Sequence, residues 1–125
     1  MKELQQDYHC AIDMVIELIG GKWKVLILWN LNEGDKRFNE LRRSIPDITQ
    51  KMLTQQLREL EAHGLVSRTV FQEVPPRVEY ATTALGKKLQ KTLFEMCRWG
   101  DDYAEEEGIN MNRCWTTYDF MEKQT

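Results

Sequence analysis

Apolar residues recur at helical spacing along most of the chain. This spacing predicts helices over residues 10–19, 22–31, 38–44 and 49–64, and a long last helix that Thr83 can cap and that runs to about Glu107. Residues 65–71 and 78–82 are instead rich in β-branched and aromatic side chains, which predicts the two strands of a hairpin. The loop between them contains Pro75 and Pro76, which cannot donate ladder hydrogen bonds. The pattern predicts a mainly α protein with a small β-hairpin, an α+β fold.

The helix predicted over residues 49–64 has the clearest amphipathic pattern. Leu53, Leu57 and Leu60 share one face, while Thr49 can cap the first turn and Gly64 can end the helix. The opposite face offers amide, ammonium and guanidinium groups, which pair with base edges and phosphates. We therefore predict a recognition helix that enters the DNA major groove, with contacts from Gln50, Lys51, Thr54, Gln55 and Arg58.

The neighbours of this helix complete a DNA-binding arrangement. The helix over 38–44, the break at residues 45–48 and the helix over 49–64 form a helix-turn-helix, and a hairpin directly after a recognition helix is a wing. Contacts with the DNA backbone are predicted from basic side chains around the helix and in the wing, namely Lys36, Arg37, Arg42, Arg43, Arg68 and Arg77. For Arg77, the alternative is that its side chain merely solvates the loop.

The last predicted helix carries a second pattern. Apolar or small residues repeat at alternating intervals of four and three, at Leu89, Leu93, Met96, Gly100 and Tyr103. A regular stripe of this length has more apolar surface than a small winged domain covers, which predicts a partner chain. Trp23 and Trp99 lie at helical core spacing, so we interpret them as packing residues rather than as platforms for bases.

The distribution of charge along the chain is more informative about DNA binding than the net charge. The net charge of −3 and the pI near 5.4 argue by themselves against nucleic-acid binding. However, residues 22–91 hold 13 Lys and Arg against 8 Asp and Glu, a net of +5, whereas the two flanking segments together carry −8. A basic centre between acidic ends allows local phosphate binding with weak non-specific affinity. Random segregation of surface charge is the alternative.

The length of 125 residues suits one domain. We expect an N-terminal arm over residues 1–9, a winged helix-turn-helix domain with a C-terminal dimerisation helix over 10–108, and a tail over 109–125. The longest apolar run, Val25 to Trp29, is too short to span a bilayer, so we expect a cytoplasmic protein without a membrane partner. The sequence contains no nucleophile–base pair, phosphate loop or metal-ligand spacing, and we expect neither an enzyme nor a cofactor or metal.

The three cysteines, Cys10, Cys97 and Cys114, form no Cys-x-x-Cys pair, which favours neither a secreted disulfide scaffold nor a zinc site. Cys10 stands at the start of the first predicted helix. One interpretation is a buried cysteine that acts as a small apolar residue. The other is a reactive thiolate favoured by the free N–H groups of the helix start, although Asp7 and Asp13 oppose it.

Six stretches occur in order between residues 10 and 107: Cys10, Ile19-Gly20-Gly21-Lys22-Trp23, Arg37–Leu41, Ile48–Leu57, Val74–Tyr80 and Trp99-Gly100. Together they resemble the HxlR-type family of bacterial winged helix-turn-helix transcription regulators. The resemblance implies a sequence-specific DNA-binding regulator that is dimeric through its first and last helices. Such a homodimer binds double-stranded DNA at a pseudo-palindromic operator, with half-sites about 34 Å apart.

The resemblance also implies roles for particular residues. The dimer interface would add Ile12 and Ile16 of the first helix to the stripe of the last helix. Members of the family respond to redox or small-molecule signals, and Cys10 occupies the place of their sensing cysteine, with Cys97 and Cys114 as candidate partners. A winged-helix protein-interaction module without DNA binding, and a regulator controlled by a non-covalent small ligand, are the alternatives.

Overall fold

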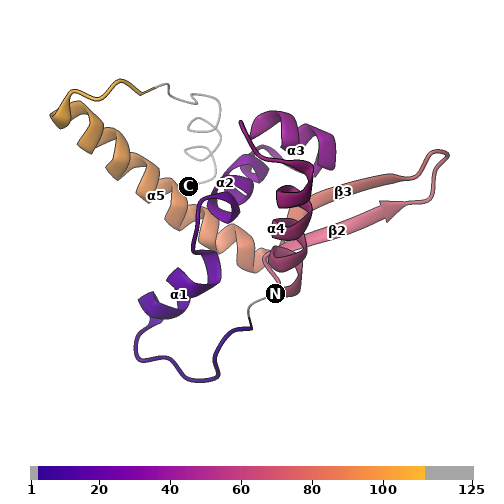
Figure 1. Ribbon diagram of the computed structural model, residues 1–125, viewed down its shortest axis with the longest axis horizontal. Helices are drawn as coiled ribbons and strands as arrows, with labels where there is room; N and C mark the ends of the chain where they lie inside the picture. The colour runs from indigo at the N-terminus through magenta and orange to yellow at the C-terminus, as the bar shows by residue number, and fades with distance from the viewer. Residues whose placement is uncertain (1–2, 112–125) are drawn as a thin grey trace.

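The computed structural model describes residues 3–111 as a helical body from which a β-hairpin and a long helix project (Figure 1). Helices and strands follow one another as α1 (Ala11–Ile19), α2 (Trp23–Asn30), the short 3-10 helix η1 (Leu31–Glu33), β1 (Lys36–Arg37), α3 (Phe38–Ser44), α4 (Gln50–Ala62), β2 (Val66–Phe71), β3 (Arg77–Thr82) and α5 (Ala84–Glu107). The predicted mainly α fold with a small β-hairpin is confirmed. Residues 112–125, which hold Cys114 and most of the expected tail, lie outside the described residues.

One strand of the sheet has no counterpart in the sequence prediction. The sheet has three antiparallel strands in the order β1-β3-β2, because Lys36 and Arg37 pair with Tyr80 and Glu79 at the edge of the hairpin. A strand of two residues is too short to show a periodic pattern. The expectation of a hairpin alone was therefore incomplete.

The hydrophobic core lies around α2, which contacts α3, α4 and α5. Ile27 and Leu28 are fully buried, and the three leucines of α4, namely Leu53, Leu57 and Leu60, are at most 1% exposed. Trp23 packs against this cluster, as its helical spacing predicted. The apolar face of α4 is therefore fixed against the body, which leaves its polar face outward.

Two side-chain hydrogen bonds connect α5 to the rest of the fold. The buried Gln90 Nε2 donates to the Leu28 carbonyl oxygen at 2.7 Å, which ties α5 to α2. The Thr83 hydroxyl donates to the Gly64 carbonyl oxygen at 2.6 Å and accepts from the Gly86 N–H at 3.1 Å. A Cβ atom on Gly86 would overlap the Leu65 carbonyl oxygen, so the start of α5 lies directly against the chain that leaves α4.

The far part of α5 and the outer face of α1 carry exposed apolar side chains. Ile12 and Ile16 of α1 are 63% and 62% exposed, and Met96, Trp99 and Tyr103 of α5 are 57%, 67% and 48% exposed. The expectation that Trp99 packs in the core is wrong for this protomer, because its ring is exposed and stacks on Tyr103 at a centroid distance of 5.3 Å.

Two residues of the predicted interface stripe belong to the protomer itself. Leu93 is only 3% exposed, and Leu89 is half-buried against the same core. Among residues 3–111, the exposed part of the stripe therefore begins at Met96.

Candidate nucleic-acid interface

Helix α4 is held at both ends and along its inner side. The Thr49 hydroxyl accepts the Met52 N–H at 3.1 Å, so the predicted N-cap is confirmed. Gly64, with φ of 77°, lies in the left-handed conformation that ends a helix. In addition, the Lys24 ammonium of α2 forms an ion pair with the Glu59 carboxylate of α4 at 3.4 Å, with side chains only 11% and 12% exposed. These contacts fix the direction in which the outer face points.

The outer face of α4 brings together all five residues predicted to read DNA. Gln50, Lys51, Thr54, Gln55 and Arg58 line one shallow hollow, together with Glu59. All but the half-buried Thr54 are exposed, and the Thr54 hydroxyl donates to the Gln50 carbonyl oxygen at 2.8 Å. Within residues 3–111, the side chains of Lys51 and Arg58 form neither an ion pair nor a hydrogen bond. Their charges are available to an external ligand.

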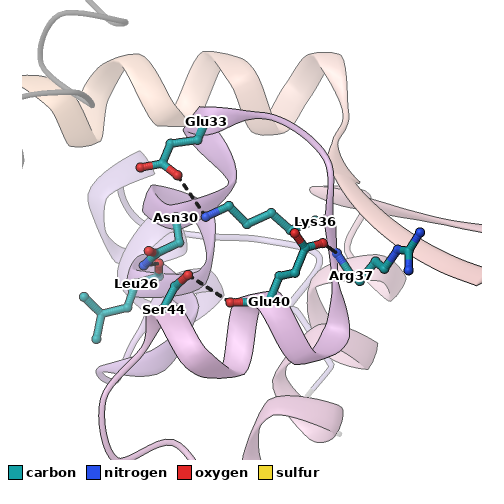
Figure 2. Close-up of polar contacts among 7 residues, drawn as sticks. All are labelled: Leu26, Asn30, Glu33, Lys36, Arg37, Glu40 and Ser44. Atoms are coloured by element: carbon teal, nitrogen blue, oxygen red, sulfur yellow. Dashed lines mark hydrogen bonds and ion pairs between the residues drawn. The ribbon is translucent and has the colours of Figure 1, made fainter.

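The basic residues near α3 differ from one another in availability. Arg42 and Arg43 are exposed in the last turn of α3, where they line a hollow with the turn over residues 45–48. Figure 2 shows a different situation for Lys36, whose ammonium lies 3.0 Å from the Glu33 carboxylate. The Arg37 N–H donates to Glu40 Oε1 at 2.8 Å, while the Arg37 guanidinium extends away from these groups (Figure 2).

The wing separates its two predicted arginines onto opposite faces. Arg68 lies opposite Tyr80 in the β2–β3 register, on the face that carries the buried Val66. Arg77 lies opposite Phe71, on the other face, with its guanidinium 4.1 Å from the Phe71 ring centroid. Arg77 also pairs with Glu73 at 3.3 Å and with Glu79 at 3.9 Å. A contact of Arg77 with DNA would therefore compete with two carboxylates.

Two features of this surface were missed from the sequence. Tyr80 was interpreted only as a strand residue, yet it lines a cleft shared by α4 and the wing. The pair of Lys24 with Glu59 joins positions 35 residues apart, and nothing in the spacing of the two residues indicates that they meet. Lys24 is the only polar residue between Trp23 and Trp29, and this was the one available signal that it has a buried partner.

The cysteines occupy different environments. Cys10 is exposed at the N-cap position of α1, and its side chain makes no capping hydrogen bond. Cys97 of α5 is partly buried. Among residues 3–111 there is no group of His, Cys, Asp and Glu side chains that could hold a metal ion. No helix in that range is long and apolar enough to cross a membrane.

The helix-turn-helix of α3 and α4, followed by the wing of β2 and β3, defines a winged helix-turn-helix DNA-binding protein. Residues 18–108 match the family described as HxlR-like helix-turn-helix, and the chain belongs to that family. The resemblance inferred from the sequence motifs is thereby confirmed.

Similar proteins are named as transcriptional regulators. The HTH-type transcriptional regulator YkvN of Bacillus subtilis (strain 168) is 56% identical over 100 residues, which cover 80% of this chain and 85% of YkvN. Reduced HypR, described as a redox regulator, has a TM-score of 0.75 and 44% identity, covering 81% of this chain and 100% of the HypR chain. Reduced YodB from B. subtilis has a TM-score of 0.69 and 38% identity, and the match covers 80% of this chain and 98% of the YodB chain. The protein is accordingly an HTH-type transcriptional regulator.

Proposed function

We propose that this regulator binds a specific operator as a homodimer, with α4 of each protomer in the major groove, and that oxidation of Cys10 modulates binding. The observation that carries the proposal is the outer face of α4, where Lys51 and Arg58 have no partner among residues 3–111 and share one hollow with two exposed amides. Buried leucines hold the opposite face, so the helix cannot turn this surface inward.

The chemistry of this face supports a division of roles. Glutamine amides can pair with adenine through two hydrogen bonds, and an arginine guanidinium pairs in the same way with guanine or with a phosphate. We therefore assign base contacts to Gln50 and Gln55 and a phosphate contact to Lys51. Thr54 and Arg58 could contact either a base or a phosphate. Arg42 and Arg43 would contact the backbone beside α3. Arg37 and Arg68 are free to do the same, whereas Lys36 and Arg77 would have to leave their carboxylates.

Selection of bound sequences from a random duplex pool, with and without the thiol oxidant diamide, tests this function directly. We expect an enriched inverted repeat with half-sites about one DNA turn apart, roughly 34 Å. Gln55→Ala should cost about 1–3 kcal/mol on the selected operator and relax the sequence preference, because it removes a base contact. Gln6→Ala, an exposed glutamine of the N-terminal arm, is the matched control. Binding that shows no salt dependence and no enriched sequence would contradict DNA reading.

The redox part of the proposal rests on the position of Cys10 and on the relatives. The thiol is exposed at the start of α1, whose exposed Ile12 and Ile16 belong to the proposed dimer surface. A bond formed at Cys10 would therefore act next to the contact between protomers. HypR is described as a redox regulator, in oxidised and reduced forms, and YodB was solved after diamide treatment.

Diamide treatment followed by non-reducing electrophoresis and a DNA-binding assay tests this role. Two thiols would form one disulfide, and diamide would accept the two electrons and two protons. We expect a reducible species and altered operator affinity, both lost in Cys10→Ser. Cys97→Ser and Cys114→Ser identify the second thiol. Unaltered operator affinity after treatment, or a response retained by Cys10→Ser, would contradict sensing by Cys10.

A further inference from the structure

A cleft of about 280 Å³ lies between the recognition helix and the base of the wing. One stripe of α4 forms its first wall, at positions spaced as i, i+3, i+4 and i+7, and the two long strands form the second. Figure 1 shows α4 packed at the point where β2 and β3 leave the body. The lining residues are Thr54, Leu57, Arg58, Glu61, Arg68 and Tyr80.

The sheet register explains why Arg68 and Tyr80 line the same cleft. The two residues are directly opposite each other in the β2–β3 pairing, so their side chains leave the sheet on one face. That face also carries Val66, which is 2% exposed beneath the body. The aromatic ring of Tyr80 packs against the core, and the residue also lines the cleft.

Three hydrogen-bond donors line this cleft. Within the part of the chain that the structure describes, the guanidinium groups of Arg58 and Arg68 and the hydroxyl of Tyr80 form no ion pair or hydrogen bond. Two guanidinium groups and a neutral hydroxyl suit a group that carries one negative charge and several acceptor oxygens. The Glu61 carboxylate lines the same cleft and opposes an anion there.

The geometry of a winged helix on DNA supplies such a group. When a recognition helix lies in the major groove and a wing reaches the flanking backbone or minor groove, the DNA strand between the two passes between helix and wing. We propose that the cleft binds a single phosphate diester of that strand, with the Tyr80 hydroxyl donating to a phosphate oxygen held between Arg58 and Arg68. This inference rests on the proposed DNA-binding function, and it adds Tyr80 as a residue that fixes the register of α4 on the operator.

The first test is Tyr80→Phe, which removes the hydroxyl and keeps the ring in the core. The variant should unfold at the same temperature as the wild type, because the hydroxyl has no partner in the part of the chain that the structure describes. It should bind the selected operator and a random duplex about tenfold more weakly, since a neutral donor to a charged acceptor is lost. The dependence of affinity on salt should not change, whereas Arg68→Gln should lower the salt slope by about one. Tyr8→Phe, which removes a hydroxyl outside the cleft, is the control for DNA affinity.

The second test locates the phosphate. An operator series carrying one uncharged methylphosphonate at each backbone position is titrated with wild type and with Tyr80→Phe. At one position per half-site the wild type should lose affinity and the variant should lose much less, because the two changes remove the same contact. Glu61→Gln should strengthen binding to the selected operator and to a random duplex several-fold, because it removes the carboxylate that opposes the phosphate. Glu105→Gln, near the end of α5, is its control.

The outcomes separate two failures. Wild-type binding with unchanged Tyr80→Phe affinity, or a variant weakened equally at every methylphosphonate position, would overturn the cleft as a phosphate site and leave the proposed function intact. If the wild type binds no duplex at all, both the proposed function and this inference are overturned.

Discussion

The side chains of Lys24 and Glu59 illustrate how single residues position the DNA-binding surface. Lys24 lies on the mostly buried helix α2, and its ammonium meets the Glu59 carboxylate of α4 at 3.4 Å. A charge removed from water is tolerated only when it is paired, and a pair in this environment contributes little net stability beyond satisfying its own partners. The ion pair instead helps to fix the orientation of α4, because it links one position of α4 to one position of α2.

Removal of one partner should therefore be far more costly than removal of both. Glu59→Gln leaves the Lys24 ammonium almost buried without a counter-charge, and we expect the free energy of unfolding to fall by about 3 kcal/mol. Lys24→Met combined with Glu59→Leu should lose much less than the sum of the single changes. Urea titrations of the two single variants and the double variant measure this coupling. Additive losses would contradict the ion pair, and Glu95→Gln, from an exposed pair, is the control.

At the scale of residues, the sequence predicted which side chains share the outer face of α4, but it did not predict which ion pairs form in the wing. The five polar residues of α4 could be predicted, because a helical period places them opposite three leucines and the structure gathers them around one hollow. The pairing of Arg77 with Glu73 and Glu79 could not be predicted. It depends on the loop conformation and on the sheet register. Glu73 and Arg77 have the four-residue spacing of a helical ion pair, but the chain between them is a loop and not a helix.

At the scale of elements, two threonine caps have unequal importance. Thr49 caps α4 through one hydrogen bond, in which its hydroxyl accepts the Met52 N–H. The Thr83 hydroxyl caps α5 by accepting the Gly86 N–H and also donates to the carbonyl oxygen of Gly64. Thr83 therefore caps α5 and also connects the start of α5 to the chain segment between α4 and the wing.

This difference predicts unequal effects of the same substitution. Thr49→Ala should lower the free energy of unfolding by about 1 kcal/mol, the usual cost of a lost N-cap. Thr83→Ala should cost roughly twice as much, because a second hydrogen bond is lost as well. Thr83→Ser retains both hydrogen bonds and should recover most of that loss. Thermal unfolding followed by circular dichroism compares the three variants, and equal losses in the two alanine variants would show that the bond to Gly64 contributes nothing.

The elements themselves were predictable where a period or a cap marks them. The helix over 38–44 was placed with the bounds of α3, and the caps at Thr49 and Thr83 are as expected. Strand β1 was missed because its two residues gain extended structure only by pairing with β3. The prediction that α2 continues to Leu31 was one residue too long, since the chain tightens there into η1.

At the scale of the whole molecule, the wing and α5 extend from the body in opposite directions (Figure 1). The basic residues proposed to contact DNA lie on β1, α3, α4 and the wing, whereas the far end of α5 carries exposed apolar side chains and ends in three glutamates. The mild negative net charge of the chain therefore does not describe its DNA-facing surface. It reflects the acidic segments on either side of the basic residues 22–91.

The proposed dimer predicts a distinctive effect at Gly100. Among residues 3–111, nothing within 4 Å would meet a Cβ atom there, so this part of the protomer tolerates a larger residue. In isolation, Gly100→Ala should favour α5 by about 1 kcal/mol, because alanine is the better helix former. If α5 approaches its copy closely at this position, Gly100→Leu should weaken dimerisation at least tenfold while each protomer keeps its helical content.

Sedimentation equilibrium across a range of concentrations measures that change, and circular dichroism monitors the fold. Gly86→Ala provides the contrast, because its added Cβ atom would overlap the Leu65 carbonyl oxygen and should destabilise the protomer itself. Met96→Glu should dissociate the dimer in the same way as Gly100→Leu, since it places a charge on the exposed apolar surface of α5. A dimer whose affinity is unchanged by both Gly100→Leu and Met96→Glu would show that this part of α5 lies outside the interface.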